Sequence, residues 1–234
     1  MLDKIKKYSD IKKLSIEDLR PLSDDVASLI KEVVKKEGGH YSSPLGVVDL
    51  SVALHYVYNS PIDKIIWDVG HQAYAHKILT ERKEEFSTLR QKDGISGFLK
   101  REESEHDIIG AGHASTSISS ALGIAHARDY KKEDYDIVSV IGDGAMTGGL
   151  AYEGMNNLGF HRTQLTIVLN DNSKSISDSV GALSRYLNRI ITNPTYNKLR
   201  SELWGIAGKL PLASKVIKKF LRKSEEGIKG FLTP

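Results

Sequence analysis

The sequence predicts an α/β fold, a doubly wound parallel sheet with helices on both faces. Three short apolar runs, at residues 65–69, 137–141 and 165–169, alternate with longer segments of helical periodicity. Each run is followed by glycine or by polar residues, as at the ends of parallel strands that carry a binding site. Three strands are few for a sheet with this many helices, so we expect the sheet to be incomplete at its C-terminal end.

The first third of the chain predicts two helices before the first strand. Residues 15–36 have helical periodicity, with Ser15 as the N-cap. A second helix is expected over 45–58 and is stopped by Asn59-Ser60-Pro61. The strand at 65–69 then leads through Gly70 and His71 to a helix over 73–80 and a charged connection at 82–85.

The middle of the chain continues the alternation. Residues 90–107 are polar and contain glycine, which indicates a loop. A helix over 115–130, the strand at 137–141, a helix over 147–158 stopped by Gly159, and the strand at 165–169 follow. Residues 173–197 are rich in Ser, Asn and small residues, and form either a mobile binding loop or a plain surface connection.

Composition and charge limit the class of protein. The 234 residues contain no apolar run of about 18, no cysteine and no signal-peptide pattern, which favours a cytoplasmic protein without membrane spans. Residues 198–229 hold nine Lys or Arg against three Glu. Such a basic stretch could bind nucleic acid or an anionic membrane, but no nucleic-acid module accompanies it. We therefore favour a solvated amphipathic helix and expect neither partner.

The strongest chemical signal is a Gly-Asp-Gly triplet at 142–144 paired with Asn-Asp-Asn at 170–172. Asp143 follows the strand at 137–141, and Asn172 follows the strand at 165–169. If the two strands are parallel neighbours, a carboxylate and an amide oxygen meet at their carboxyl ends. Hard oxygen donors beside glycines suit Mg²⁺ carrying a diphosphate. A Gly-Asp-Gly triplet alone is a common turn, and the pairing makes it specific.

Further candidates surround this pair. Gly112, His113 and Ala114 precede the helix at 115–130, whose free N–H groups would attract phosphate oxygens. Gly144 and Ala145 precede the next helix and would act likewise. His71 follows the first strand, and a histidine there is more often a structural hydrogen-bonding residue than a ligand. His40, between Gly39 and Tyr41, is equally ambiguous.

The flanking segments resemble one family over nearly the whole chain. They read GGHYSSPLG at 38–46, IWDVGHQAYAHKILT at 66–80, GHASTSIS at 112–119, IGDGAMTGG at 141–149 and LNDN at 169–172. These segments resemble 1-deoxy-D-xylulose-5-phosphate synthase, a transketolase-like thiamine diphosphate enzyme. The WDVGHQAY segment is particular to this synthase, since ordinary transketolases differ there.

The resemblance implies roles for individual residues. Asp143 and Asn172 match the Mg²⁺ ligands, together with the backbone carbonyl of Lys174, where the family usually has Met. His40 matches a histidine near the reacting carbon of the cofactor and is implied to be catalytic, as is His71. A larger set matches positions that contact the cofactor's diphosphate and thiazolium: His71, Gly112, His113, Ala114, Asp143, Gly144, Ala145 and Asn172. Ala114 stands where many relatives have Ser, so one hydrogen bond to phosphate would be missing.

The resemblance also implies a reaction. It is the decarboxylative condensation of pyruvate with D-glyceraldehyde 3-phosphate, by a homodimer that feeds isoprenoid and thiamine biosynthesis. The family's activating glutamate lies in a later, pyrimidine-binding domain that these 234 residues do not include. We expect a diphosphate-binding domain over 1–234 that is a fragment, or one subunit of a split enzyme, inactive alone. A non-catalytic diphosphate-binding protein is the alternative.

Overall fold

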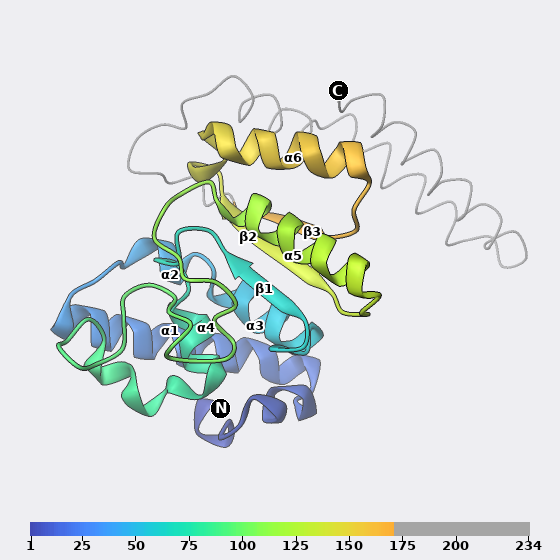
Figure 1. The fold of residues 1–234 in the computed structure, drawn as a ribbon. Coiled ribbons are helices and arrows are strands. Elements are labelled where there is room, and N and C mark those ends of the chain that lie inside the picture. The colour runs from blue at the N-terminus through green and yellow to red at the C-terminus, as the bar shows by residue number, and fades with distance from the viewer. Residues whose placement is uncertain (171–234) are drawn as a thin grey trace, which may run out of the picture. The chain divides into compact units, whose positions relative to one another are not determined.

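The computed structural model describes residues 1–170 of the chain (Figure 1). Contacts divide the chain into two units, Met1–Val180 and Gly181–Pro234, and the description concerns the first. The predictions for Asn172, Lys174, the segment at 173–197 and the basic stretch at 198–229 lie outside the described residues.

A parallel sheet forms the centre of the described part. Its strands are β1 (Lys64–Trp67), β2 (Ile137–Gly142) and β3 (Thr166–Asn170), in the order β1-β2-β3. Trp67 pairs with Val140, and Gly142 pairs with Asn170, so the carboxyl ends of all three strands lie at one edge. The predicted strands and the parallel pairing of the last two are confirmed.

Helices cover both faces of the sheet, which confirms the doubly wound class. Alternate strand residues point to opposite faces. On one face, Ile65 and Trp67 pack with Leu54 of α3 (Val48–Val57). On the other face, Ile66 packs with Ala121 of α5 (Ser117–Lys131), and α6 (Gly149–His161) lies beside α5 (Figure 1).

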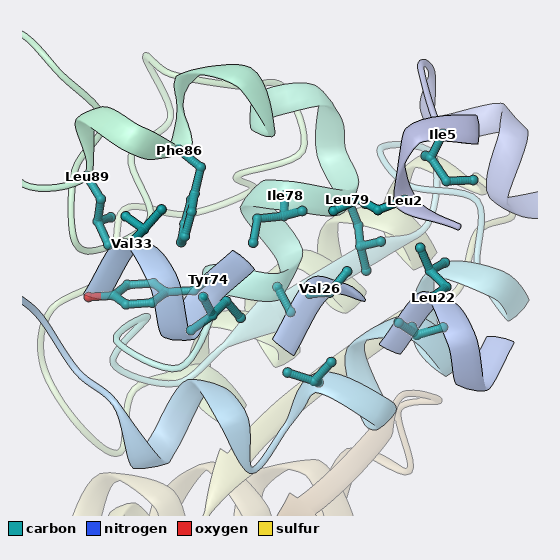
Figure 2. Close-up of a cluster of buried hydrophobic side chains, with 14 of the residues drawn as sticks. Leu2, Ile5, Leu22, Val26, Val33, Tyr74, Ile78, Leu79, Phe86 and Leu89 are labelled. Carbon is teal, nitrogen blue, oxygen red and sulfur yellow. The ribbon is translucent and has the colours of Figure 1, made fainter. Parts of the chain in front are cut away.

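Helices from the N-terminal part of the chain form a layer that contains the largest apolar cluster of the described residues (Figure 2). Leu22, Val26 and Val33 of α1 (Ile16–Glu37) contribute to it, together with Tyr74 of α4 (Tyr74–Lys77). The remaining short elements are η1 (Leu2–Lys4), η2 (Tyr8–Lys13), α2 (Ser42–Leu45), η3 (Ile78–Arg82), η4 (Glu84–Thr88) and η5 (Ala145–Thr147). None of the described helices is long and apolar enough to cross a membrane.

Ser15 is the N-cap of α1 as predicted, and its N–H and Oγ–H both donate to the Asp18 carboxylate. Three element boundaries were wrong. The helix predicted over 45–58 starts only at Val48, since Leu45 ends the short helix α2, and β1 ends at Trp67 because the next residues turn away from the sheet. Gly159 does not stop α6, which ends at His161, and the next residue, Arg162, takes the left-handed conformation (φ 53°).

Candidate active site

The turn after β1 carries His71 to the edge where all three strands end. Val69 (φ 61°) and Gly70 (φ 86°) are both left-handed, which reverses the chain within three residues of the strand. A side chain at Gly70 would lie 3.0 Å from the Ala111 Cβ and 3.1 Å from the Leu99 N, so only glycine fits. The turn therefore lies directly against the segment that leads to Gly112.

His40 and His71 meet although 31 positions separate them in the sequence. Their ring centroids are 5.1 Å apart in an edge-to-face arrangement, and the Phe98 ring lies 5.9 Å from His40. The buried Tyr74 holds the backbone of His40 in place, because its Oη accepts a hydrogen bond from the His40 N–H at 3.3 Å. The two residues that the resemblance implies to be catalytic thus form one pair.

Both histidines of this pair have an unused nitrogen. The Nδ1 atoms of His40 and His71 are buried and have no hydrogen-bond partner. Burial lowers the pKa of both rings; the charge of Arg90 lowers that of His40 further, and His40 does the same to His71. The pair is therefore neutral at pH 7, with buried nitrogens available to a ligand.

The start of α5 differs from what the sequence predicted. The N–H groups of Ser115 and Ser117 donate to Oδ1 and Oδ2 of Asp68, at 2.8 and 3.0 Å. The expectation that these N–H groups are free for phosphate was therefore wrong, because a buried carboxylate from the end of β1 already occupies them. Sequence analysis missed Asp68 as a residue of the site. Its place between an apolar strand and Gly70 was the signal that could have found it.

The segment that carries Gly112, His113 and Ala114 lies beside the turn after β2. The Ser115 Oγ donates to the Ala145 carbonyl oxygen at 2.6 Å. A side chain at Gly112 or Gly144 would meet no atom within 4 Å, so both backbones face open space. His113 is exposed, and its Nδ1 hydrogen-bonds only to the neighbouring Ala114 carbonyl at 2.7 Å. The structure therefore brings together two short, accessible backbone segments that suit a diphosphate.

Asp143 lies half-buried at the end of β2. Its N–H donates to the Asn170 carbonyl oxygen at 3.2 Å, which joins the ends of β2 and β3. Within residues 1–170, no cluster of three or more His, Asp or Glu side chains could hold a metal ion. Asn172 and Lys174, which are expected to bind the metal together with Asp143, lie beyond these residues. The set of magnesium ligands therefore stays a prediction.

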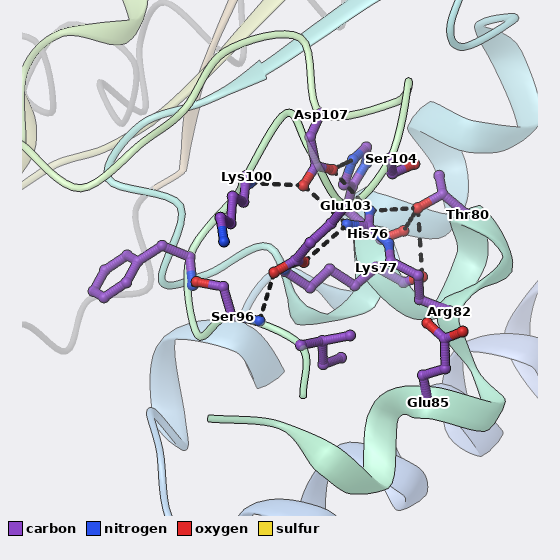
Figure 3. Close-up of polar contacts among 12 residues, drawn as sticks. His76, Lys77, Thr80, Arg82, Glu85, Ser96, Lys100, Glu103, Ser104 and Asp107 are labelled. Atoms are coloured by element: carbon purple, nitrogen blue, oxygen red, sulfur yellow. Dashed lines mark hydrogen bonds and ion pairs between the residues drawn. The ribbon is translucent and has the colours of Figure 1, made fainter. Parts of the chain in front are cut away.

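A second polar cluster, which sequence analysis also missed, is built around His76, Arg82 and Asp107 (Figure 3). His55 and His76 face each other with Nε2 and Nδ1 2.9 Å apart, and His76 Nε2 hydrogen-bonds to Asp107 at 3.2 Å. Both terminal nitrogens of Arg82 donate to the same carboxylate, at 2.9 and 2.7 Å. Lys77 pairs with Glu103 alongside. We refer to these six residues as the buried ion network.

The likeness to a solved structure shows the class of fold. A transketolase from Campylobacter jejuni superposes with a TM-score of 0.63 at 22% identity, over 72% of this chain and 30% of the transketolase. The described part therefore has a transketolase-like fold.

The sequence comparisons are more specific. The sequence model of 1-deoxy-D-xylulose-5-phosphate synthase matches residues 2–234, and the chain belongs to this family. It is 52% identical over 234 residues to the synthase of Caldanaerobacter subterraneus and 51% identical to that of Syntrophus aciditrophicus. All of this chain is covered, but only 38% and 36% of those relatives. The chain thus spans little more than a third of their length.

Proposed function

We propose that this chain forms the diphosphate-binding part of a 1-deoxy-D-xylulose-5-phosphate synthase that uses thiamine diphosphate and Mg²⁺. The reaction is the decarboxylative condensation of pyruvate with D-glyceraldehyde 3-phosphate, which feeds isoprenoid and thiamine biosynthesis. The observation that carries the proposal is the pair of buried, unpartnered Nδ1 atoms on His40 and His71, at the sheet edge that also holds Asp143.

The residues present fit the cofactor. The open backbones at Gly112 and Gly144 leave room for a diphosphate, which small side chains allow to approach closely. Asp143 supplies a carboxylate for Mg²⁺, to be joined by Asn172 and the backbone carbonyl of Lys174. His113, Ala114 and Ala145 complete the set of proposed contacts.

The protein's own contribution is orientation and proton handling. When bound, the thiazolium supplies the carbanion chemistry of the reaction. The neutral rings of His40 and His71 can accept or donate a proton at their free Nδ1 atoms, because each imidazole has one donor and one acceptor nitrogen. The Phe98 ring lies edge-on to His40, 5.9 Å between centroids, and forms an apolar contact on that side of the pair.

The proposal assigns the rest of the catalytic site to segments outside these 234 residues, since the relatives are much longer. The 234-residue chain should therefore bind cofactor weakly and sustain no turnover. In complete form we propose a cytoplasmic homodimer. The alternative, a non-catalytic diphosphate-binding protein, shares the strand-end site and differs in having no turnover in any context.

A chimera tests both possibilities. This chain would replace the matching segment of the Caldanaerobacter synthase, and the unaltered synthase would serve as the activity reference. We expect the chimera to release carbon dioxide from pyruvate only when D-glyceraldehyde 3-phosphate, Mg²⁺ and thiamine diphosphate are present. A folded chimera that binds the cofactor without turnover would support the non-catalytic alternative.

Asp143→Ala in the same chimera should abolish Mg²⁺-dependent cofactor binding, because it removes the charged oxygen ligand. Calorimetry measures the affinity, and Asp129→Ala, an exposed carboxylate on α5, is the control. Unchanged affinity in Asp143→Ala would contradict the assignment.

A further inference from the structure

Asp68 is a buried carboxylate that no step of the proposed reaction uses. Its relative exposure is 1%, and no Lys, Arg or His forms an ion pair with it in the described part of the chain. Backbone amides satisfy its side chain instead, Ser115 at Oδ1 and Ser117 at Oδ2. A carboxylate at the N-terminus of α5 is favoured by the helix dipole and by the unpaired N–H groups there.

Asp68 connects two turns that are both in unusual conformations. Val69, the next residue, has a φ of 61°, and Ser115 has a φ of 71°. A positive φ is rare for any residue with a side chain and costly for a β-branched one. Such conformations persist only where the surroundings fix them, and the two hydrogen bonds of Asp68 join one turn to the other.

The connection continues to the end of β2. The Oγ of Ser115 donates to the Ala145 carbonyl, and a side chain at Gly148 would lie 2.1 Å from that same Oγ. The Ser117 Oγ accepts a hydrogen bond from Ser139 of β2 at 3.0 Å. One carboxylate therefore fixes the turn of His71, and through Ser115 the turn of Ala145, relative to the segment at 112–114.

We propose that Asp68 is a positioning residue for the diphosphate site. It accepts hydrogen bonds from the amides of Ser115 and Ser117, so these two amides at the start of α5 are not available to an anion. The diphosphate is placed on the outer backbone at 112–114 and 144–145, whose separation Asp68 sets. This inference rests on the proposed function and deepens it.

Asp68→Asn tests the idea with almost no change of volume. An asparagine offers one acceptor oxygen, and its NH₂ group would face the second backbone N–H, donor against donor. One of the two hydrogen bonds is lost, and the segment at 112–117 must shift. Asp63→Asn is the matched control, because Asp63 also accepts two backbone N–H groups, from Asn59 and Asp136, but just before β1, at the opposite edge of the sheet.

Two quantities are measured in the chimera: the thiamine diphosphate concentration that gives half-activation, which we call the cofactor constant, and turnover at saturating cofactor. We expect Asp68→Asn to raise the thiamine diphosphate concentration needed for half-activation by about tenfold or more, while turnover at saturating cofactor changes less than about threefold. Asp63→Asn should leave both unchanged. An unchanged cofactor constant in Asp68→Asn would overturn the proposal, whether or not the variant melts earlier.

Hydrogen exchange separates this result from failure of the proposed function. In the 234-residue chain, the Ser115 and Ser117 amides should exchange at least about tenfold faster in Asp68→Asn than in the unaltered chain. If the unaltered chimera bound no cofactor, the proposed function would fail on its own evidence. Equal exchange in the two chains would overturn the role of Asp68 independently.

Discussion

Two histidine pairs in the described part of this molecule have almost the same ring separation and opposite hydrogen-bonding states. The rings of His40 and His71 are 5.1 Å apart, and those of His55 and His76 are 5.0 Å apart. In the first pair both Nδ1 atoms lack a partner. In the second pair both nitrogens of each ring are engaged, with Tyr8, the partner ring or Asp107.

Both burial and hydrogen bonding distinguish the two pairs, since His40 and His71 are half-buried and each has one nitrogen without a partner. The second pair is fully buried, and it belongs to a network in which the charges of Lys77, Arg82, Glu103 and Asp107 cancel while the histidines stay neutral. Only the Arg82 Nε of that network lacks a partner. A satisfied network of this kind holds a structure together, whereas unpartnered buried nitrogens beside open backbone indicate a ligand.

The largest expected effect comes from breaking the buried ion network. Asp107→Asn removes the carboxylate that Arg82 and His76 share and leaves the guanidinium with only the more distant Glu103 carboxylate, at 3.6 Å. Loss of one partner of a buried pair costs about 3–5 kcal/mol in the free energy of unfolding. Denaturant unfolding measures it. Asp24→Asn, in an exposed pair with Arg20, should change it little; equal losses in both variants would contradict a special role for the network.

Substituting one member of each pair by glutamine sharpens the comparison. His71→Gln or His40→Gln in the chimera should lower turnover by about 100-fold while the free energy of unfolding changes by less than about 1 kcal/mol. His76→Gln should do the reverse, because Asp107 and His55 lose a partner. Unfolding curves and single-turnover rates give both quantities. If His71→Gln lost stability and kept its turnover, the first pair would be structural.

The smallest expected effect is the contribution of the second pair to the pH dependence of stability. Burial lowers the pKa of His76 from 6.5 to about 4, against the opposing hydrogen bond and charge of Asp107. Burial, followed by the positive charges around it, lowers the pKa of His55 well below 6.5. Between these values the unfolded chain binds more protons than the folded chain. Stability is therefore complete above pH 6.5 and falls as the pH drops toward 4, with about 2 kcal/mol lost through His76 alone by pH 5.

Unfolding free energies of the 234-residue chain and its His76→Gln variant at pH 7 and pH 5 measure this dependence. The variant should lose less between the two pH values than the unaltered chain. Replacement of the exposed His126 by glutamine is the control, and it should leave the slope unchanged. A slope that is the same in all three chains would show that His76 does not titrate in this window.

The strands, and the sheet edge at which the candidate site lies, could be predicted from the sequence because their signals are local. Apolar runs followed by glycine and polar residues located β1, β2 and β3, and with them His71 and Asp143. Gly159 misled because a glycine stops a helix only where the chain takes the left-handed turn. Here α6 continues two residues further and Arg162 takes that conformation instead.

Other features depend on contacts between distant segments. His76 lies five residues after His71 in one continuous segment, yet only the fold shows that it faces His55 and Asp107 rather than His40. Asp68 likewise looks like the end of a strand, and only the approach of Ser115, 47 positions later, makes it the cap of α5. Periodicity carries no information about either partner.

Imidazole nitrogen chemical shifts give the most direct test of the division between the two pairs. The 234-residue chain, labelled with ¹⁵N, would be titrated with Mg²⁺ and thiamine diphosphate while long-range ¹H–¹⁵N spectra follow each histidine ring. We expect the Nδ1 signals of His40 and His71 to move with added cofactor and those of His55 and His76 to stay fixed. Shifts at His55 and His76 with none at His40 and His71 would contradict the assignment of the strand-end pair to the cofactor.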